Sequence, residues 1–235
     1  MGESAVRKSD MSHPQYHKRK EERNRNIHSR LGKLNDAEFA FSKALEFHTN
    51  INNVIWQGND IQQLGDIYQR LGKVDMAKTS YFQALDLHKI ANDNLGQGND
   101  YFYLGDAYLM LNKPNEAKIS FYKALEFHKL ANDVIGQGND YYGLGRVYLS
   151  LGKLEKAESL FYKALDLHKV ANSILSQGND LLELGKLYVE MLKLKDAKRI
   201  FEEALIMHKQ AQASGMQKID QDYLNEVLLK LDLSS

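Results

Sequence analysis

Histidine is the side chain that most often carries acid–base chemistry, metal binding or pH sensing near neutrality, and in this chain it recurs at a fixed spacing. Residues that recur with such a period occupy equivalent positions of adjacent stacked units, and these positions lie about 10 Å apart. Two imidazoles at that distance cannot share a metal at about 2.1 Å per bond. We therefore predict histidines that pack and hydrogen-bond a neighbouring helix, and we keep pH sensing and metal binding as alternatives. Five of the eight histidines lie 40 residues apart, at His48, His88, His128, His168 and His208.

A tetrapeptide, Gln-Gly-Asn-Asp, repeats with the same period, at 57–60, 97–100, 137–140 and 177–180. A ladder of asparagine amides can clamp an extended peptide by its backbone. Alternatively, the Asn and Asp side chains bond to adjacent helices and fix their spacing. We favour the structural role for the aspartates and leave both roles open for the asparagines, which are Asn59, Asn99, Asn139 and Asn179.

Motifs for catalysis or cofactor binding are absent from the sequence. Each Gly-Lys pair, such as Gly72-Lys73, is followed by Leu or Val instead of the Ser or Thr of a phosphate-binding loop. No Gly-x-Gly-x-x-Gly fingerprint and no His-Glu-x-x-His helix occurs, and the chain has no cysteine for thiolate chemistry, disulfides or zinc. We therefore predict no enzymatic activity, no cofactor and no metal.

Charge and hydropathy exclude further classes. The 31 basic and 31 acidic residues balance to zero net charge, whereas nucleic-acid binders usually need a strongly basic face. The basic stretch Lys18–Arg30 fits a solvated face better than an RNA or lipid contact, because no aromatic residues interleave it. No apolar run approaches the roughly 20 residues of a membrane span, and the N-terminus lacks the apolar core of a secretory signal. We expect a cytoplasmic protein that binds no nucleic acid and inserts into no membrane.

The histidines and the tetrapeptide belong to a repeated unit that predicts a helical hairpin. In the unit 98–137, apolar residues have helical spacing over 101–111, and Asn112–Pro114 breaks the pattern. Asn115 can then cap a second helix, which Asn132-Asp133 can end before capping the next. A glycine recurs in the middle of each first helix, where a Cβ would strike the neighbouring helix, at Gly65, Gly105, Gly145 and Gly185.

This pattern resembles the tetratricopeptide repeat over residues 17–215. The usual period is about 34 residues, here it is 40, and a lysine replaces the proline that usually follows the second helix. The extended units are similar to those of kinesin light chains, Pins-type scaffold proteins and fungal repeat arrays. The resemblance implies an all-α fold: a right-handed α-solenoid of stacked antiparallel helical hairpins, the TPR-like superhelix. In the third unit the pattern is carried by Tyr101, Leu104, Gly105, Tyr108, Ala117, Phe121 and Ala124.

We divide the chain into a disordered N-terminal tail at 1–14 and one continuous solenoid at 15–233. The first unit begins with a mostly charged stretch, Tyr16 to Leu31, as expected of a cap with a single neighbour. The last amphipathic stripe is in register with a first helix but lacks its glycine, so we assign it to a C-terminal cap. The predicted helix pairs are 15–55, 56–95, 96–135, 136–175 and 176–215, followed by a capping helix at 216–232.

The resemblance also implies a concave groove that the four asparagines face. Further positions would line it, and one of them changes sign along the axis, which suits a directional peptide. Ordinary solvated or packing roles are the alternative for these positions. The Lys, Asn and Arg set that holds a terminal carboxylate is not convincingly present, which disfavours chaperone C-termini as ligands. Besides Gln62, Asp66 and Leu182, the candidate groove residues are Asn59, Asn99, Asn139, Asn179, Phe102, Asp106, Leu109, Met110, Tyr142, Arg146 and Lys186.

The leading interpretation is a non-catalytic protein–protein interaction scaffold that binds a peptide or a partner helix in this groove. One alternative is a structural spacer that self-associates through the ends of the solenoid. A second alternative is a sensor or regulatory arm of a larger ATPase or transferase.

Overall fold

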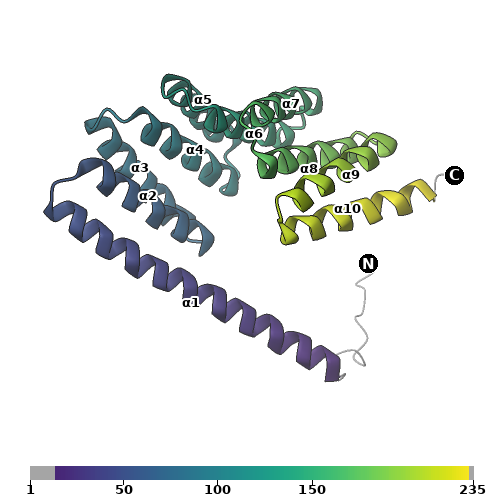
Figure 1. Cartoon of the computed structure of the whole chain (residues 1–235), viewed down its shortest axis with the longest axis horizontal. Helices are drawn as coiled ribbons and strands as arrows, with labels where there is room; N and C mark the ends of the chain where they lie inside the picture. The colour runs from purple at the N-terminus through teal and green to yellow at the C-terminus, as the bar shows by residue number, and fades with distance from the viewer. Residues whose placement is uncertain (1–13, 233–235) are drawn as a thin grey trace, which may run out of the picture.

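The computed structural model describes the backbone of residues 14–232 and the side chains of residues 32–232. All regular structure in this part of the chain is α-helical, as predicted, and the helices stack side by side into an array (Figure 1). The predicted tail at 1–14 lies almost wholly outside the described residues. The helices are α1 Pro14–Asn50, α2 Val54–Arg70, α3 Val74–Ile90, α4 Asn94–Met110, α5 Pro114–Leu130, α6 Val134–Ser150, α7 Leu154–Val170, α8 Ile174–Glu190, α9 Leu194–Gln210 and α10 Ser214–Asp232.

The period of the sequence follows directly from these lengths. Each helix from α2 to α9 has 17 residues. Three-residue turns join them, so two helices and two turns make one 40-residue unit. The middle residue of each turn has a positive φ, which Asn and Gly adopt at least cost. The residues in this conformation are Asn52, Gly72, Asn92, Asn112, Asn132, Gly152, Asn172, Leu192 and Gln212.

The predicted turn residues are partly right. Asn132 follows α5 in the left-handed conformation and Asp133 stands at the N-cap of α6, as expected, but the side chain of Asp133 makes no capping hydrogen bond. The prediction that Asn115 caps α5 is wrong, because that helix already begins at Pro114 with Lys113 at its N-cap. Proline fits the first helical position since its missing N–H would have had no partner there.

The first predicted helix pair, 15–55, is instead the single helix α1. Its residues Leu31-Gly32-Lys33 match Leu71-Gly72-Lys73, which do form a turn between α2 and α3. The difference has a physical reason in the charged stretch Lys18–Arg30. A helix with no apolar stripe has nothing to bury by folding back, so the chain continues straight.

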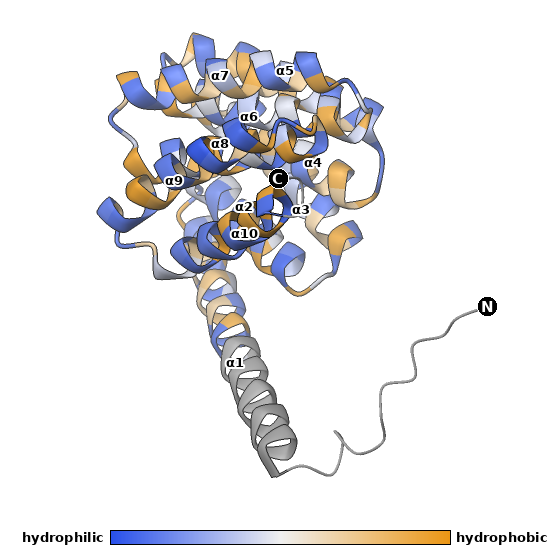
Figure 2. Cartoon of the chain, turned by 90° about the vertical axis from the view of Figure 1, so that its right-hand side faces the viewer, coloured by the Kyte–Doolittle hydropathy of each residue, from blue (hydrophilic) through white to orange (hydrophobic). Residues whose placement is uncertain are grey.

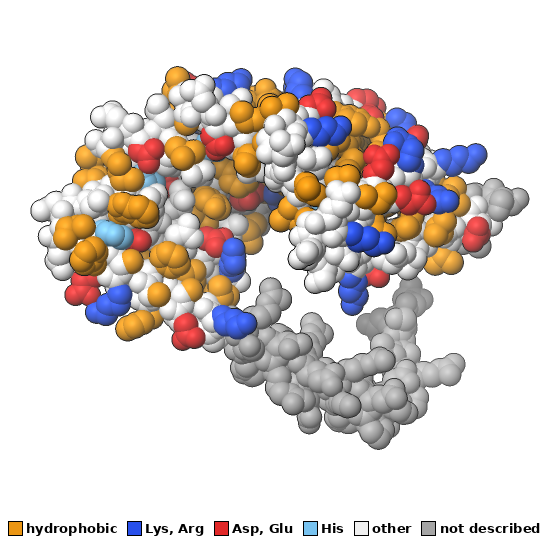
Figure 3. All heavy atoms as spheres, in the orientation of Figure 1, with side chains coloured by type: hydrophobic (Ala, Val, Ile, Leu, Met, Phe, Trp, Pro, Cys, Tyr) orange, Lys and Arg blue, Asp and Glu red, His pale blue; other side chains and the backbone are white. Residues whose placement is uncertain are grey.

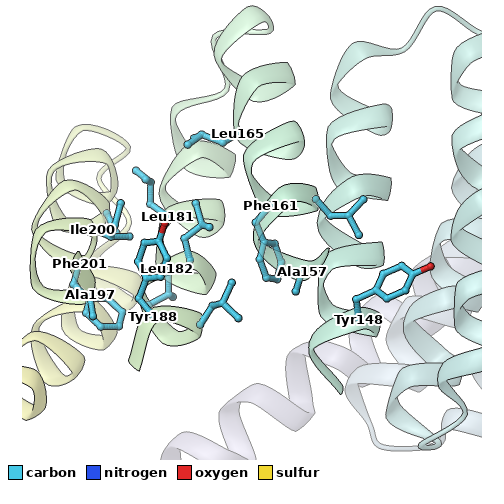
Figure 4. Close-up of a cluster of buried hydrophobic side chains, with 14 of the residues drawn as sticks. Tyr148, Ala157, Phe161, Leu165, Leu181, Leu182, Tyr188, Ala197, Ile200 and Phe201 are labelled. Atoms are coloured by element: carbon cyan, nitrogen blue, oxygen red, sulfur yellow. The ribbon is translucent and has the colours of Figure 1, made fainter. Parts of the chain in front are cut away.

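Close packing inside each hairpin depends on the predicted glycines. A Cβ added at Gly105 would lie 2.7 Å from the ring of Phe121, and one at Gly145 would lie 2.5 Å from the ring of Phe161. Real Cβ atoms do not approach other atoms so closely, which confirms the prediction that these positions admit no side chain. Figure 4 shows Phe161 and its equivalent Phe201 inside the core, which they share with Leu181.

The array is curved, with one set of helices inside. Successive even-numbered helices from α2 to α10 contact one another, so they form the inner layer, and α3, α5, α7 and α9 form the outer one. The space-filling view shows a hollow between the two ends of the array (Figure 3). Among the described residues, none of the helices combines the length and apolar character needed to cross a bilayer.

Candidate functional site

A pocket of about 170 Å³ opens on the inner side of the array, where α4, α6 and α8 meet. It combines aromatic, amide, imidazole and carboxylate groups within one small space. Four of the residues predicted for the groove converge on it, two asparagines and two aromatics. Its lining residues are Phe102, Asn139, Tyr142, His168, Ser176, Asn179 and Asp180.

The base of the pocket is a hydrogen-bonded triad from three helices. His168 of α7 places its Nδ1 2.6 Å from Oδ2 of Asp180 on α8. Its Nε2 lies 3.2 Å from Oδ1 of Asn139 on α6. His168 and Asp180 are buried, whereas Asn139 is half-buried at the pocket. The triad therefore holds together the two helices of one unit and the first helix of the next.

The proton count of this triad fits its burial. An amide oxygen only accepts, so the Nε2 of His168 donates to Asn139. One more proton lies between Nδ1 and the carboxyl group, and the His–Asp pair is then neutral as a whole. Burial raises the pKa of Asp180 to about 6, although the hydrogen bond and charge of His168 oppose the shift. A neutral pair is the form that a buried site tolerates best.

The same His–Asp contact recurs at every unit boundary. The Nδ1 to Oδ2 distance is 2.6 Å in the pair of His48 with Asp60 and 2.5 Å in the pair of His88 with Asp100. It is again 2.6 Å in the pairs of His128 with Asp140 and of His208 with Asp220. The geometry agrees with the interpretation of the histidines as packing residues that bond a neighbouring helix.

The histidines also explain the glycine of each Gln-Gly-Asn-Asp. A Cβ at Gly138 would lie 2.5 Å from Nε2 of His168, and one at Gly178 would lie at the same distance from Nε2 of His208. Glycine therefore lets the imidazole rest on the backbone of the preceding helix. One histidine thus contacts all four members of the tetrapeptide. His168 lies against Gly138 and Asn139 of one copy, and Gln177 and Asp180 of the next copy bond it.

One carboxylate oxygen distinguishes the units from one another. Oδ1 of Asp100 accepts a 2.6 Å bond from Nε2 of Gln62, but Oδ1 of Asp140, Asp180 and Asp220 has no partner among the described residues. Gln62 stands 38 residues before its aspartate, and the same position holds Phe102, Tyr142 and Leu182 in the later units. These three side chains lack a donor that reaches the buried oxygen. Of these three aspartates, Asp180 is the one that lines the pocket, together with Tyr142.

The aromatic wall of the pocket is fixed by the core. The ring of Phe102 lies 5.6 Å from Phe121, edge to face, and that of Tyr142 lies 5.9 Å from Phe161. Burial raises the pKa of Tyr142, so its hydroxyl stays protonated at physiological pH. The wall therefore offers apolar surface and a neutral hydroxyl.

The predicted charge gradient is largely cancelled in the structure. Arg146 donates a 2.6 Å bond to Oδ1 of Asp106, the equivalent residue of the preceding unit. Asp66 pairs with Arg70 at 2.8 Å, and Lys186 donates to Glu183 at 2.6 Å. Charges that neutralise one another attract a charged ligand weakly, so these residues do not set the direction of a bound peptide along the groove.

The remaining predicted groove residues lie apart from the pocket. Asn99 bonds His128 at 3.2 Å, as Asn139 bonds His168. The corresponding bond from Asn59 is not formed, and Nε2 of His88 is buried without a partner. Leu109 packs partly buried against the core, whereas Met110 is exposed at the end of α4.

Two predicted groove positions are wrong. Gln62 and Leu182 are buried, the first bonded to Asp100 and the second packed in the core. Lys186, also predicted for the groove, places its Nζ 5.3 Å from the ring centroid of Tyr223 on α10.

Three pocket residues were not predicted for the groove: His168 and Asp180, to which the sequence reasoning gave packing roles, and Ser176, which it did not consider. Gly96 and Gly136 hold this position in earlier units, and a Cβ there would collide with a histidine ring and with the carboxylate of Asp93 or Asp133. In this unit Ser173 replaces that aspartate and donates a 2.8 Å bond to Ser176. The paired departure from the repeat, two serines in place of Asp and Gly, was the available signal.

Metal binding finds no support in the described part of the chain, where no group of three His, Cys, Asp or Glu side chains is placed to hold an ion. Each of the recurring histidines bonds a single aspartate, so no two of these histidines share a site.

Solved structures of the same fold come from several sources. BtubC from P. vanneervenii is 17% identical, with a TM-score of 0.64 over 85% of this chain and 92% of that one. A Rap protein in complex with Competence and Sporulation Factor is 13% identical, with a TM-score of 0.62 over 89% and 74%. The kinesin light chain TPR-like repeats of Podosopora anserina are 15% identical, with a TM-score of 0.54 over 75% and 96%. At these identities the likeness shows the fold alone.

No curated protein matches the chain in sequence. The sequence profile of the tetratricopeptide repeat matches residues 59–129 and 138–210, which together make up more than half of the chain. The 40-residue hairpins, their glycine and aromatic packing and this match agree. The chain therefore belongs to the tetratricopeptide repeat family, whose fold is typically one of protein interaction.

Proposed function

We propose that the protein is a non-catalytic interaction scaffold whose inner pocket between α4, α6 and α8 anchors a segment of a partner protein by its backbone. The observation that carries the proposal is that Asp180, whose buried Oδ1 has no partner among the described residues, is one of the residues that line the pocket. A buried acceptor without a partner costs about 1–3 kcal/mol. Because Oδ1 is buried, the bound segment would have to displace part of the pocket wall for one of its N–H groups to reach this oxygen and recover that free energy.

The neighbouring groups supply hydrogen-bond donors for the carbonyl oxygen of a ligand peptide bond. Asn139 and Asn179 both line the pocket, and each turns its Oδ1 to a histidine. Their amide N–H groups are therefore the atoms that remain to donate to a ligand carbonyl. Asp180 as acceptor and two amides as donors match one extended backbone segment.

The pocket size sets what else the ligand brings. A space of about 170 Å³, walled by Phe102 and Tyr142, accommodates one apolar side chain of the bound segment. The remaining contacts would lie along the inner helices outside the pocket. A Rap protein of this fold was solved with Competence and Sporulation Factor bound, which supports ligand binding as a use of the fold.

The test begins with selection of ligands from a random peptide display library on the wild-type protein, followed by calorimetric affinities. Asn139→Ala removes a pocket donor, and we expect about three- to tenfold weaker binding. Ser176→Met fills the pocket, and we expect about tenfold weaker binding or more. Met216 holds the equivalent position in α10, so this backbone tolerates a methionine.

Asn99→Ala is the matched control, because it removes the same bond to a histidine outside the pocket. We expect it to weaken binding clearly less than Asn139→Ala, with equal losses of thermal stability. Equal affinities for the wild type, Asn139→Ala and Ser176→Met would overturn the proposal. A mass that rises with concentration in light scattering, without peptide binding, would favour the self-associating spacer instead.

A further inference from the structure

An open groove of about 630 Å³ lies on the outer side of the array, between α5 and α7. Both helices pack on α6 (Figure 2), so α6 forms its floor. The apolar surface comes from Leu125 and Tyr122 of α5, Tyr141 of α6 and Leu160 of α7. It is far larger than the inner pocket, and the two share no lining residue.

The rim of this groove is basic. Lys129, Lys156 and Lys163 surround the apolar floor, and Glu126 is the one acidic residue among those that line it. The three lysines are exposed, and none of them forms an ion pair with a described residue.

Two of the three ammonium groups are held in place by aromatic rings. Nζ of Lys156 lies 4.2 Å from the ring centroid of Tyr148, and Nζ of Lys163 lies 5.6 Å from that of Tyr141. Cation–π contacts of this kind reduce side-chain freedom and leave the N–H groups on the outer side for an anion. The positive charges are thus positioned before any ligand arrives.

Equivalent grooves elsewhere in the array have a different charge. Between α3 and α5 the three rim positions hold Lys89, Glu116 and Lys123, and between α7 and α9 they hold Lys169, Asp196 and Glu203. The pockets there are smaller, at about 250 and 150 Å³. Of these three grooves, the α5–α7 groove combines the largest volume with lysine at all three positions, and a repeat that merely packs does not require that difference.

We propose that the outer α5–α7 groove binds an acidic peptide segment of a partner protein, with one large apolar side chain between its carboxylates. The apolar side chain would lie on Tyr141 and Leu160, and the flanking carboxylates would face Lys129, Lys156 and Lys163. Charge complementarity selects the acidic ligand, and the apolar floor separates it from a simple counter-ion. The site is independent of the inner pocket, so the two can hold different segments.

The probe is the peptide fluorescein-Asp-Glu-Phe-Leu-Glu-Asp-amide, with the dye coupled to its N-terminal amine, titrated with the full chain and followed by anisotropy. Lys156→Glu/Lys163→Glu reverses two rim charges, and we expect affinity to fall roughly tenfold or more. Lys123→Glu is the matched control. Lys123 holds the same repeat position as Lys163 and lies 5.1 Å from the ring of Tyr101, but its groove also holds Glu116. We expect less than about a twofold change for it.

Two further probes separate the apolar and ionic parts. A peptide with Gly-Ser in place of Phe-Leu should bind more weakly, and raising the salt concentration should weaken the original peptide. Equal affinity of the wild type and Lys156→Glu/Lys163→Glu, with both folded by circular dichroism, would overturn the proposal. Binding to phosphatidylserine vesicles without peptide binding would overturn it in favour of a membrane surface. Self-association lost in the double variant would overturn it in favour of a second copy.

Discussion

The two halves of the solenoid repeat the same histidine–aspartate contact but differ in the hydrogen bonds that the aspartate receives. Around α2 to α4, the buried carboxylate of Asp100 receives both a histidine and Gln62. Around α6 to α8, the carboxylate of Asp180 receives a histidine alone, and a pocket opens beside it. The comparison shows that the repeat fixes the histidine contact, whereas the variable position of Gln62 and Tyr142 decides whether the second carboxylate oxygen has a donor.

The largest expected effect comes from removing the histidine–aspartate contact that the units share. His128→Ala leaves the buried Asp140 without its partner, and we expect a loss of about 3–5 kcal/mol in the free energy of unfolding. His48→Ala is the matched control at the outermost pair, where the histidine side chain is 20% exposed and water can replace it. We expect a loss of about 1 kcal/mol there. Urea denaturation followed by circular dichroism measures both losses. Equal losses would contradict the expectation that the buried pair stabilises the fold more than the partly exposed pair.

A smaller effect is expected where glycine lets the histidine approach. Gly138→Ala places a Cβ 2.5 Å from Nε2 of His168, and we expect a loss of about 1–3 kcal/mol from overpacking. Gly215→Ala is the control, since a Cβ there meets nothing within 4 Å and alanine favours the helix. Chemical denaturation should show a loss for the first and none for the second. A loss in both would mean that the glycines act through something other than the histidine.

The smallest effect concerns pH. Burial raises the pKa of Asp140 and of Asp180 from 3.8 to about 6 in the folded chain. The folded state therefore binds protons more tightly than the unfolded state. The stability that these groups contribute is fully present below pH 4 and is lost as the pH rises through 6.

We therefore expect the stability of the wild type relative to Asp180→Asn to rise by about 1 kcal/mol between pH 7.5 and pH 5, in denaturant titrations at several pH values. Asp86→Asn, at an exposed residue that pairs with Lys89, is the control and should show no such trend. A relative stability that falls toward pH 5 would reverse the sign and contradict the neutral buried pair.

The fold follows from the sequence because its determinants are local and repeated. Gly145 and Phe161 lie 16 residues apart in one hairpin, and their spacing alone predicts the close contact that the structure has. The same reasoning fails for α1, where the turn sequence Leu31-Gly32-Lys33 is present but its apolar support is not. A turn signal therefore acts only when the helices on both sides have a face to bury.

The candidate site was predicted less completely because it depends on pairs that the sequence leaves open. Asn139, Asn179, Phe102 and Tyr142 were predicted for the groove and do line one pocket. The bond of Asn139 to His168 spans 29 residues, and several partners were equally compatible with the pattern. The unpaired oxygen of Asp180 is harder still, since it results from a donor that is missing. The replacement of Gln62 by Tyr142 at the equivalent position removes this donor, but the sequence alone does not show that Gln62 bonds an aspartate.

The proposed binding role of the inner pocket is tested most directly by exchanging one position between the two halves. Tyr142→Gln places at this position the residue type of Gln62, which donates to Oδ1 of Asp100. The new amide should donate in the same way to Oδ1 of Asp180. Tyr142→Leu is the matched control, because it removes the same ring without supplying a donor and is found at Leu182. The measurement is the affinity of each variant for a display-selected peptide. We predict binding roughly tenfold weaker for Tyr142→Gln than for Tyr142→Leu, with stability equal or higher. Equal affinities of the two variants would contradict the role of the unpaired carboxylate oxygen.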